Sequence, residues 1–505
     1  MTSQQTMAKD FLASVVVFLV ALPLCLGIAI ASGVPPALGL ISGIVGGLVV
    51  GLLAGAPLQV TGPAAGLAVL VYEVVNEHGI AMLGPILLLA GSIQVVAGIL
   101  RIGQWFRAIS PAVVYGMLAG IGVLIFSAQF HVMVDDKPRA NGLENLISIP
   151  SAIYKGIFPL DGSVHHLAAG IGIVTIVTMV LWAKFRPAAL KLVPAPLLAV
   201  LVASALASAF ELPISYVVVP ERLTDSITLP TFESLSKLAN SSILLAAVAL
   251  AFIASAETLL STAAVDRLHN GPRANYDKEL TAQGVGNMLC GLFGALPLTG
   301  VIVRSSANVD AGAKTRLSAI LHGVWLLLAV LSLPAVLRLI PTSALAAILV
   351  YTGYKLVNID NIRALQRYGR VPVVIYFATV IGIVAIDLLT GVIVGVLLSL
   401  FKLVYKMTYL DIRLVQRPGT SDFDLYLEGA ATFLRLPKLA ATLDGLPAGT
   451  NLHVHVDKLT YIDHSCLDLL ASWESQNAER GSTLVVQWDG LVARYRGRTT
   501  ADLAA

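Results

Sequence analysis

Runs of apolar residues, long enough or nearly long enough to cross a lipid bilayer, follow one another from Phe11 to Lys406. A helix needs roughly 20 residues to span the hydrocarbon core. Of the 505 residues, only 12% are charged and 57% are hydrophobic, whereas about 25% of the residues of a soluble protein are charged. The runs therefore predict a polytopic α-helical membrane protein. The first run is expected to be retained as a helix, because no cleavage pattern closely follows it.

About fourteen transmembrane segments are expected from the apolar windows. The third and the tenth are too short to cross the bilayer alone. The segments begin near Phe11, Leu38, Thr61, Ala81, Pro111, Ala168, Leu192, Ile243, Glu279, Gly300, Leu317, Thr342, Val371 and Gly391.

Charges in the loops agree with this count. If residues 1–10 are cytoplasmic, every second loop should be basic. Those loops are basic, and the longest opposite loop, from Glu211 to Ser241, is acidic. The alternation predicts a multi-pass protein of the cell membrane with both termini in the cytoplasm. The basic residues are Arg101, Arg107, Lys184, Arg186, Lys191, Arg267, Arg273, Lys278, Lys314, Arg316, Lys355, Arg363, Arg367 and Arg370.

The acidic loop separates two sets of seven segments, at about residues 11–210 and 243–406. Because seven is odd, two homologous halves of this kind insert with opposite topology, which predicts a 7+7 inverted repeat. A small α/β domain at residues 410–505 is expected to follow the membrane part.

The third segment of each half contains the same interruption. The sequence Leu-x-x-Thr-Gly begins at Leu58 and again at Leu296, so that the two threonines are 299 − 61 = 238 positions apart. Each interruption would start a half-helix inside the membrane. In the first half, Thr61 would cap that helix and Pro63 would lie in its first turn. A glycine kink that serves only helix packing would explain one such break. A matched pair in the two halves indicates a binding site.

Two half-helix starts that face each other form an anion site, because each presents free N–H groups and a positive dipole end. Gly62 and Gly300 are expected to provide unusual backbone geometry. Arg304 follows by about one turn and would add charge beside the anion or pair with Glu257; alternatively it lies at the cytoplasmic mouth. The expected anion-binding residues are Thr61, Gly62, Pro63, Ala64, Thr299, Gly300, Val301, Ile302 and Arg304.

Glu257 lies midway along the eighth apolar segment. A charged carboxylate there costs roughly 2.5 to 3.5 kcal/mol on insertion scales, so intramembrane acids usually have a function. We expect Glu257 to carry the coupling ion, a proton or Na⁺, with hydroxyls from Thr258 and Ser261 nearby. The alternative is a structural carboxylate paired with a basic residue. No cofactor and no metal other than this Na⁺ is expected.

Three motifs resemble the sulfate permease family, also called solute carrier family 26. They are Ala21-Leu22-Pro23 with the following Ile28–Gly33, Gln59–Pro63, and Arg304–Leu317. The resemblance implies a seven-plus-seven fold in which a core domain moves against a gate domain, a homodimer, and substrates such as sulfate, bicarbonate, chloride, oxalate or small dicarboxylates. It also implies that Glu257 occupies the coupling position. Val303 replaces a serine found in many members.

The segment after Lys406 resembles the STAS domain of the same family. Strands are expected at 423–427, 452–456 and 484–487, and helices at 436–443 and 466–473. His464 occupies the position that is phosphorylated in soluble relatives, and Cys466 replaces a glycine. An exposed polar strand explains the histidines better than a metal site does, because His453, His455, Asp463 and His464 do not form a complete ligand set.

These features together predict a secondary active transporter of small anions, driven by H⁺ or Na⁺. An uncoupled anion channel or an anion exchanger is the first alternative. A nucleobase permease is less consistent, because the tenth segment offers Arg304 and no carboxylate before Asp310. The chain contains no combination of nucleophile and base or cofactor loop that would indicate an enzyme, and nucleic acid is not an expected partner.

Overall fold

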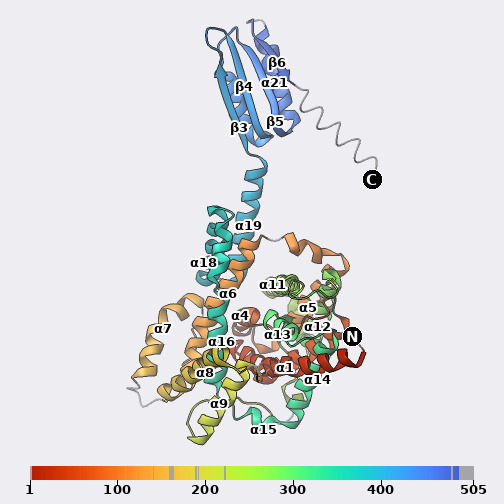
Figure 1. Ribbon diagram of the computed structural model, residues 1–505, viewed down its shortest axis with the longest axis vertical. Coiled ribbons are helices and arrows are strands. Elements are labelled where there is room, and N and C mark those ends of the chain that lie inside the picture. The colour runs from red at the N-terminus through yellow and green to blue at the C-terminus, as the bar shows by residue number, and fades with distance from the viewer. Residues whose placement is uncertain are drawn as a thin grey trace. The chain divides into compact units, whose positions relative to one another are not determined.

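The computed structural model describes residues 3–108, 110–139, 141–158, 164–187, 190, 193–220, 223–478 and 481–487. The chain divides into two compact units, Met1–Val396 and Leu397–Ala505 (Figure 1). Four positions that entered the sequence analysis lie outside the described residues: Lys191, Leu192, and positions 221 and 222 of the acidic loop. The tail beyond residue 487 lies outside them as well.

Each predicted segment corresponds to a helix or to an interrupted helix. In the described part of the chain, eight helices are long and apolar enough to cross a membrane, and three further apolar helices are shorter. The first half contains α1 (Ser3–Ala31), α2 (Pro36–Val45) with a π-helical turn η1 (Gly46–Val50) and α3 (Gly51–Leu53), α4 (Ala68–His78), α5 (Ile80–Ile99), α6 (Pro111–Met133), α8 (His165–Phe185) and α9 (Ala195–Ala209). The second half contains α11 (Ser241–Val265), α12 (Tyr276–Leu292), α13 (Ile302–Asp310), α14 (Leu317–Ser332), α16 (Thr342–Leu356), α18 (Arg370–Ala385) and α19 (Leu388–Met407).

Within the described residues of the unit Met1–Val396, the apolar segments do not account for four α-helices: α7 (Gly142–Ile157), α10 (Phe232–Ser236), α15 (Pro334–Leu337) and α17 (Ile359–Gln366). Of these, α7 and α17 each follow the fifth segment of their half, so they occupy equivalent places in the repeat. The α7 helix is amphipathic: its apolar residues are interspersed with polar ones, among them Glu144, Asn145 and Lys155. A search for uniformly apolar runs misses such a helix.

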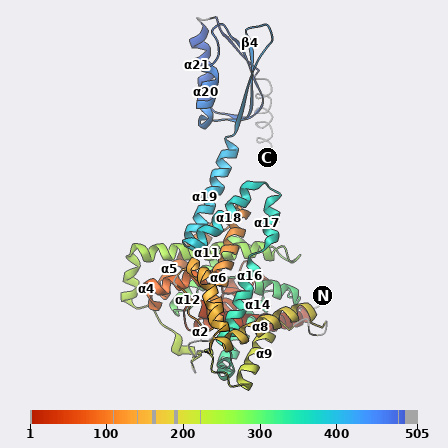
Figure 2. The same cartoon turned by 90° about the vertical axis from the view of Figure 1, so that its left-hand side faces the viewer.

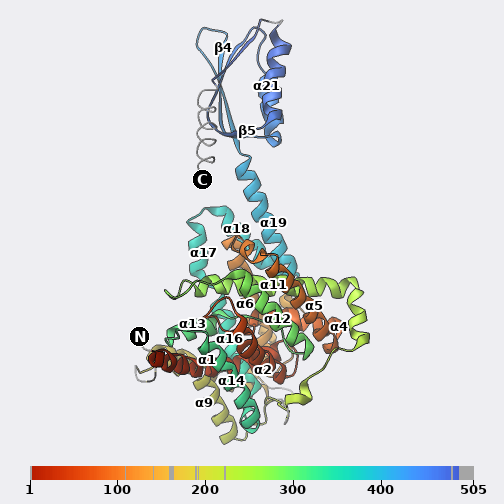
Figure 3. The same cartoon turned by 90° about the vertical axis from the view of Figure 1, so that its right-hand side faces the viewer.

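Helix packing follows the repeat. Helix α5 of the first half packs against α12 and α11 of the second half. Its equivalent in the second half, α14, packs against α2 and α1 of the first half. In the same way α6 packs against α18, and its equivalent α16 packs against α8. The equivalent helices α6 and α16 also pack against each other (Figures 2 and 3). Exchanging the halves therefore maps these contacts onto one another, as an inverted repeat requires.

Small residues allow the closest of these approaches. A Cβ atom placed on Gly84 of α5 would lie 2.7 Å from the carbonyl oxygen of Gly291 of α12, and one on Gly284 would lie 2.7 Å from that of Gly91. Backbones this close leave no room for a side chain, as at other helix contacts within membranes. The contact between α5 and α12 is therefore tight.

The tail unit contains a four-stranded sheet in the order β3-β4-β5-β6. Its strands are β3 (Leu410–Gln416), β4 (Asp422–Ala431), β5 (Asn451–Ile462) and β6 (Thr483–Gln487). The last three are parallel, and β3 is antiparallel to β4. The helices α20 (Leu436–Asp444) and α21 (His464–Asn477) pack together beside the sheet (Figure 2). The three predicted strands and both predicted helices are confirmed, and β3 was not predicted.

Candidate functional site

The two Thr-Gly breaks lie side by side as a pair of short strands. β1 (Thr61–Pro63) pairs with β2 (Leu298–Gly300) in antiparallel register, so that Thr61 faces Gly300 and Gly62 faces Thr299. The amide of Val301 also donates to the carbonyl of Val60 at 2.9 Å. Residues more than 200 positions apart thus form one element, which joins the two halves of the repeat.

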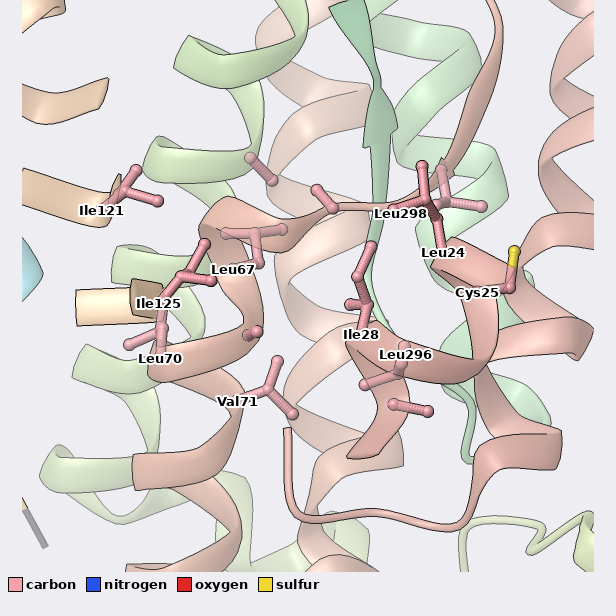
Figure 4. Packing of buried hydrophobic residues seen from close by; sticks show 14 of the residues in the cluster. Leu24, Cys25, Ile28, Leu67, Leu70, Val71, Ile121, Ile125, Leu296 and Leu298 are labelled. Carbon is pink, nitrogen blue, oxygen red and sulfur yellow. The ribbon is translucent and has the colours of Figure 1, made fainter. Parts of the chain in front are cut away.

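A half-helix leaves each strand. The first begins with a 3-10 turn, η2 (Ala65–Leu67), and continues as α4, and the second is α13. Their N-cap positions are Ala64 and Val301, and in the described chain neither has a side-chain cap. Figure 4 shows Leu67 and Leu70 of the first half-helix near Ile121 and Ile125 of α6. Because the two strands are antiparallel, the two half-helices leave this three-residue pair at its opposite ends, and neither start has a side-chain cap in the described chain.

Two expectations about the first break are wrong. Thr61 does not cap the half-helix, because it lies within β1 and its hydroxyl accepts a hydrogen bond from Gln283 at 2.8 Å. Pro63 is the last residue of β1, before the helix begins at Ala65. It therefore stands at the end of a strand, not in the first helical turn.

The role of the two glycines also differs from the expectation. Neither Gly62 nor Gly300 has a positive φ. A Cβ atom on Gly300 would overlap the side chain of Gln59, and one on Gly62 would contact the guanidinium of Arg304. These glycines provide space for side chains that cross between the breaks, and they do not adopt a special backbone conformation.

Arg304 is fully buried, which excludes an exposed position at the cytoplasmic mouth. Its Nη2 lies 3.4 Å from the carbonyl oxygen of Pro63. Among the described residues, Nε and Nη1 have no hydrogen-bond partner, and no ion pair joins Arg304 to Glu257. The guanidinium therefore places a full positive charge against the first break.

Glu257 lies on α11 with its carboxylate against the start of the first half-helix. A Cβ atom placed on Gly66 would lie 2.8 Å from Oε2 and 2.9 Å from Oε1 of Glu257. Oε2 is buried and has no hydrogen-bond partner in the described part of the protein. The geometry brings an acid and an uncapped helix end together.

The hydroxyls expected near Glu257 have different surroundings. The Thr258 hydroxyl accepts a hydrogen bond from the amide of Gly300 at 3.1 Å, so it supports the second break. Ser261 is buried on the same helix. Thr299, by contrast, is fully buried with a hydroxyl that has no hydrogen-bond partner within the described chain.

Three buried polar residues of α12 were not predicted as part of the site. Gln283 donates to Thr61, Asn287 bonds to the backbone of Leu298, and Glu279 accepts from Gln283. Their spacing of four residues in a predicted transmembrane segment is the sequence signal that would have identified them.

In the tail, Asp424 is held by two partners. It accepts two hydrogen bonds from Arg417, at 2.7 and 2.8 Å, and its Oδ1 lies 2.8 Å from Nε2 of His455. The Arg417 guanidinium, followed by His455, holds the pKa of Asp424 well below its usual range. The ring of Tyr426 stacks on His455 with a centroid distance of 4.4 Å. His455 is thus part of an ion-pair cluster on the sheet.

Comparisons with known proteins agree with this architecture. The sequence model of the Sulfate permease family matches residues 7–379. The chain is 28% identical over 415 residues to the putative sulfate transporter YvdB of Bacillus subtilis, covering 80% of this chain and 75% of that protein. It is 24% identical over 443 residues to the bicarbonate transporter BicA of Picosynechococcus, covering 83% of this chain and 74% of that protein.

Solved structures have the same fold. The transmembrane domain of a cyanobacterial bicarbonate transporter BicA is 22% identical with a TM-score of 0.64, and the match covers 77% of this chain and 98% of that one. The inward-facing murine Solute Carrier 26 family member A9 anion transporter is 15% identical with a TM-score of 0.77. That match covers 96% of this chain and 86% of the other, so it includes the tail.

Proposed function

Because this chain belongs to the sulfate permease family, whose members are transporters and not enzymes, we propose that it carries a small oxyanion across the cell membrane by secondary active transport. The observation that supports this most is the β1–β2 pair. It brings two half-helix starts from opposite halves, neither with a side-chain cap, to the two ends of one short strand pair, and such helix ends bind anions.

The anion would bind to backbone N–H groups of residues 61–64 and 299–302, with the charge of Arg304 behind them. Relatives of this chain include putative sulfate transporters and bicarbonate transporters, and a small dicarboxylate carries the carboxylate group that bicarbonate also has. Backbone amides select charge and size more than chemical identity. We therefore propose the class of small oxyanions, with sulfate and bicarbonate as the first to test.

Glu257 would carry the coupling ion. Its carboxylate lies against Gly66, at the start of the first half-helix, so its charge is close to the proposed anion. A proton or Na⁺ on this carboxylate would remove the repulsion between two negative charges. Binding of the cation and binding of the anion would then favour each other, which is the requirement for symport.

The cellular setting is proposed from the charge pattern and the family. Both termini would lie in the cytoplasm, the tail would act there as a regulatory domain, and two copies would form a homodimer. In the transport cycle the two half-helices would move together as part of the core domain.

Uptake by purified protein in proteoliposomes tests the proposal. Labelled sulfate, bicarbonate and fumarate are offered separately, and proton and Na⁺ gradients are imposed one at a time. We expect one gradient to drive accumulation of at least one anion above its equilibrium level. Flux that is independent of both gradients would indicate an uncoupled channel or exchanger, and no flux of any anion would contradict the proposal.

A further inference from the structure

We propose that α12 positions both half-helix starts, and that Gln283 and Asn287 are positioning residues that set selectivity between anions of different size. This inference rests on the proposed function, since it concerns the same site. Helix α12 would then fix the positions of the two breaks relative to each other, which neither break can do by itself.

Glu279, Gln283 and Asn287 form a polar ladder on α12. They are four residues apart, so their side chains lie on one face of the helix. All three are fully buried. Burying a polar side chain in an apolar environment is unfavourable unless it is hydrogen-bonded, so the partners of this ladder account for its presence.

Gln283 and Glu279 of the ladder hold the first break. Nε2 of Gln283 donates to the hydroxyl of Thr61 at 2.8 Å and to Oε1 of Glu279 at 2.8 Å. Glu279 also accepts from the amide of Ala56 at 2.9 Å and from Nε2 of Gln59 at 3.2 Å. The strand and the chain that leads into it are therefore fixed to α12.

Asn287 of the ladder holds the second break. The Asn287 side chain accepts from the amide of Leu298 at 2.8 Å and donates to its carbonyl at 3.1 Å. This carboxamide thus pairs with Leu298 as a neighbouring strand would.

Asn287 is itself held from the other side. It donates at 2.7 Å to Gln94 of α5, and Gln94 donates at 3.1 Å to the hydroxyl of Ser255. Ser255 lies two residues before Glu257 on α11. The ladder therefore connects β2 to the helix that carries the proposed coupling residue.

The strands need this support because each is only three residues long. An isolated two-stranded pair is at best marginally stable. The helix α12, in contrast, packs closely on α5 at Gly84 and Gly91. Contacts four residues apart on one tightly packed helix fix the offset between the two half-helix starts, and that offset decides which anion both can contact.

Transport by substituted protein tests the selectivity. Asn287→Leu and Gln283→Leu remove the two supports separately. The matched control is Thr175→Val in α8, which removes a buried hydroxyl that, among the described residues, donates to the carbonyl of Ile171 on its own helix. Gln94→Met is the milder variant, because it loosens Asn287 without removing it. Half-saturation concentrations for sulfate and bicarbonate are compared with thermal unfolding of each purified variant.

We expect each Leu variant to change the sulfate-to-bicarbonate ratio of half-saturation constants by about tenfold or more, because each loses at least two buried hydrogen bonds and one such bond has about this effect. Gln94→Met should shift the ratio in the same direction as Asn287→Leu by a smaller factor, and Thr175→Val should leave it unchanged. Folded variants with the parent ratio would overturn the proposal.

Hydrogen–deuterium exchange tests the positioning without relying on transport. In Asn287→Leu, amides of residues 298–304 should exchange faster than in the parent, while those of 60–67 change less. Gln283→Leu should show the opposite pattern. Equal exchange in both segments, or none above that of Thr175→Val, would contradict a positioning role. If the parent transports neither anion, the proposed function fails, and this measurement still decides the role of α12.

Discussion

At the scale of single residues, Glu257 and Gly66 form a contact between an acid and the start of a half-helix. The carboxylate lies against the backbone of the first half-helix, and its Oε2 has no hydrogen-bond partner in the described residues. A negative charge at a helix N-terminus is favoured by the dipole. A negative charge at the same position would repel an anion bound nearby. The charge state of Glu257 would therefore change how strongly that anion binds.

Glu257→Gln should abolish gradient-driven accumulation, because an amide cannot bind a coupling proton and carries no charge for Na⁺. The variant should remain folded, since glutamine has nearly the same size. Accumulation against a gradient and thermal unfolding are measured on the same preparation. Undiminished H⁺- or Na⁺-driven uptake would exclude Glu257 as the coupling residue.

Gly300→Ala should destabilise the protein by about 1 to 3 kcal/mol, the usual cost of overpacking, because its methyl group would overlap Gln59. Gly170→Ala is the matched control, since no atom lies within 4 Å of a Cβ placed there. Thermal unfolding and uptake are compared for both. Equal behaviour of the two variants would mean that the room beside Gly300 is not required.

At the scale of elements, the sequence predicted what depends on local pattern and missed what depends on distant partners. The apolar segments and the strands of the tail follow from composition and alternation. The strand form of the breaks does not, because Thr61 pairs with Gly300. Thr61 does not cap the half-helix because it lies within β1, three residues before the N-cap Ala64, where Gln283, 222 positions away, donates to its hydroxyl.

The N-terminal residues give a second example. The first segment was expected to begin near Phe11, but α1 already begins at Ser3, and Asp10 is buried within it. The carboxylate of Asp10 accepts from the amides of Lys314 and Thr315 at 2.6 and 3.1 Å. It therefore holds the loop between α13 and α14.

Asp10→Ala should lower the free energy of unfolding by about 1 to 3 kcal/mol, because two amides of that loop lose their acceptor. Lys9→Ala is the control, as Lys9 is exposed on the same helix. Thermal unfolding of the two variants is compared with that of the parent. A loss of stability no greater than that of the control would show that water replaces the carboxylate.

At the scale of the whole molecule, the chain consists of two units whose stabilities have different origins. The unit in the membrane depends on close backbone packing and on buried polar networks. The tail has a conventional core of aliphatic side chains between its sheet and its helices. The stability of the tail should therefore respond simply to the pH of the surrounding water.

The tail should unfold more easily in acid. The pKa of Asp424 is lowered in the folded state by Arg417 and then His455, so its contribution is present above the ordinary pKa of Asp, about 4. It is lost as pH falls below that value. The melting temperature of the isolated tail should therefore fall in this range, and Asp424→Asn should reduce the fall. Asp457→Asn, at an exposed position, should not.

The β1–β2 pair also has a consequence for biosynthesis. The two strands belong to parts of the chain that are synthesised far apart in time. Closing the loop of 238 residues (299 − 61) between them costs on the order of 5 kcal/mol of chain entropy. Until the second half has been synthesised, β1 has no partner strand, and the face that it buries in the finished protein is uncovered. The proposed anion site can therefore form only after β2 (Leu298–Gly300) has been synthesised and β1 has gained its partner.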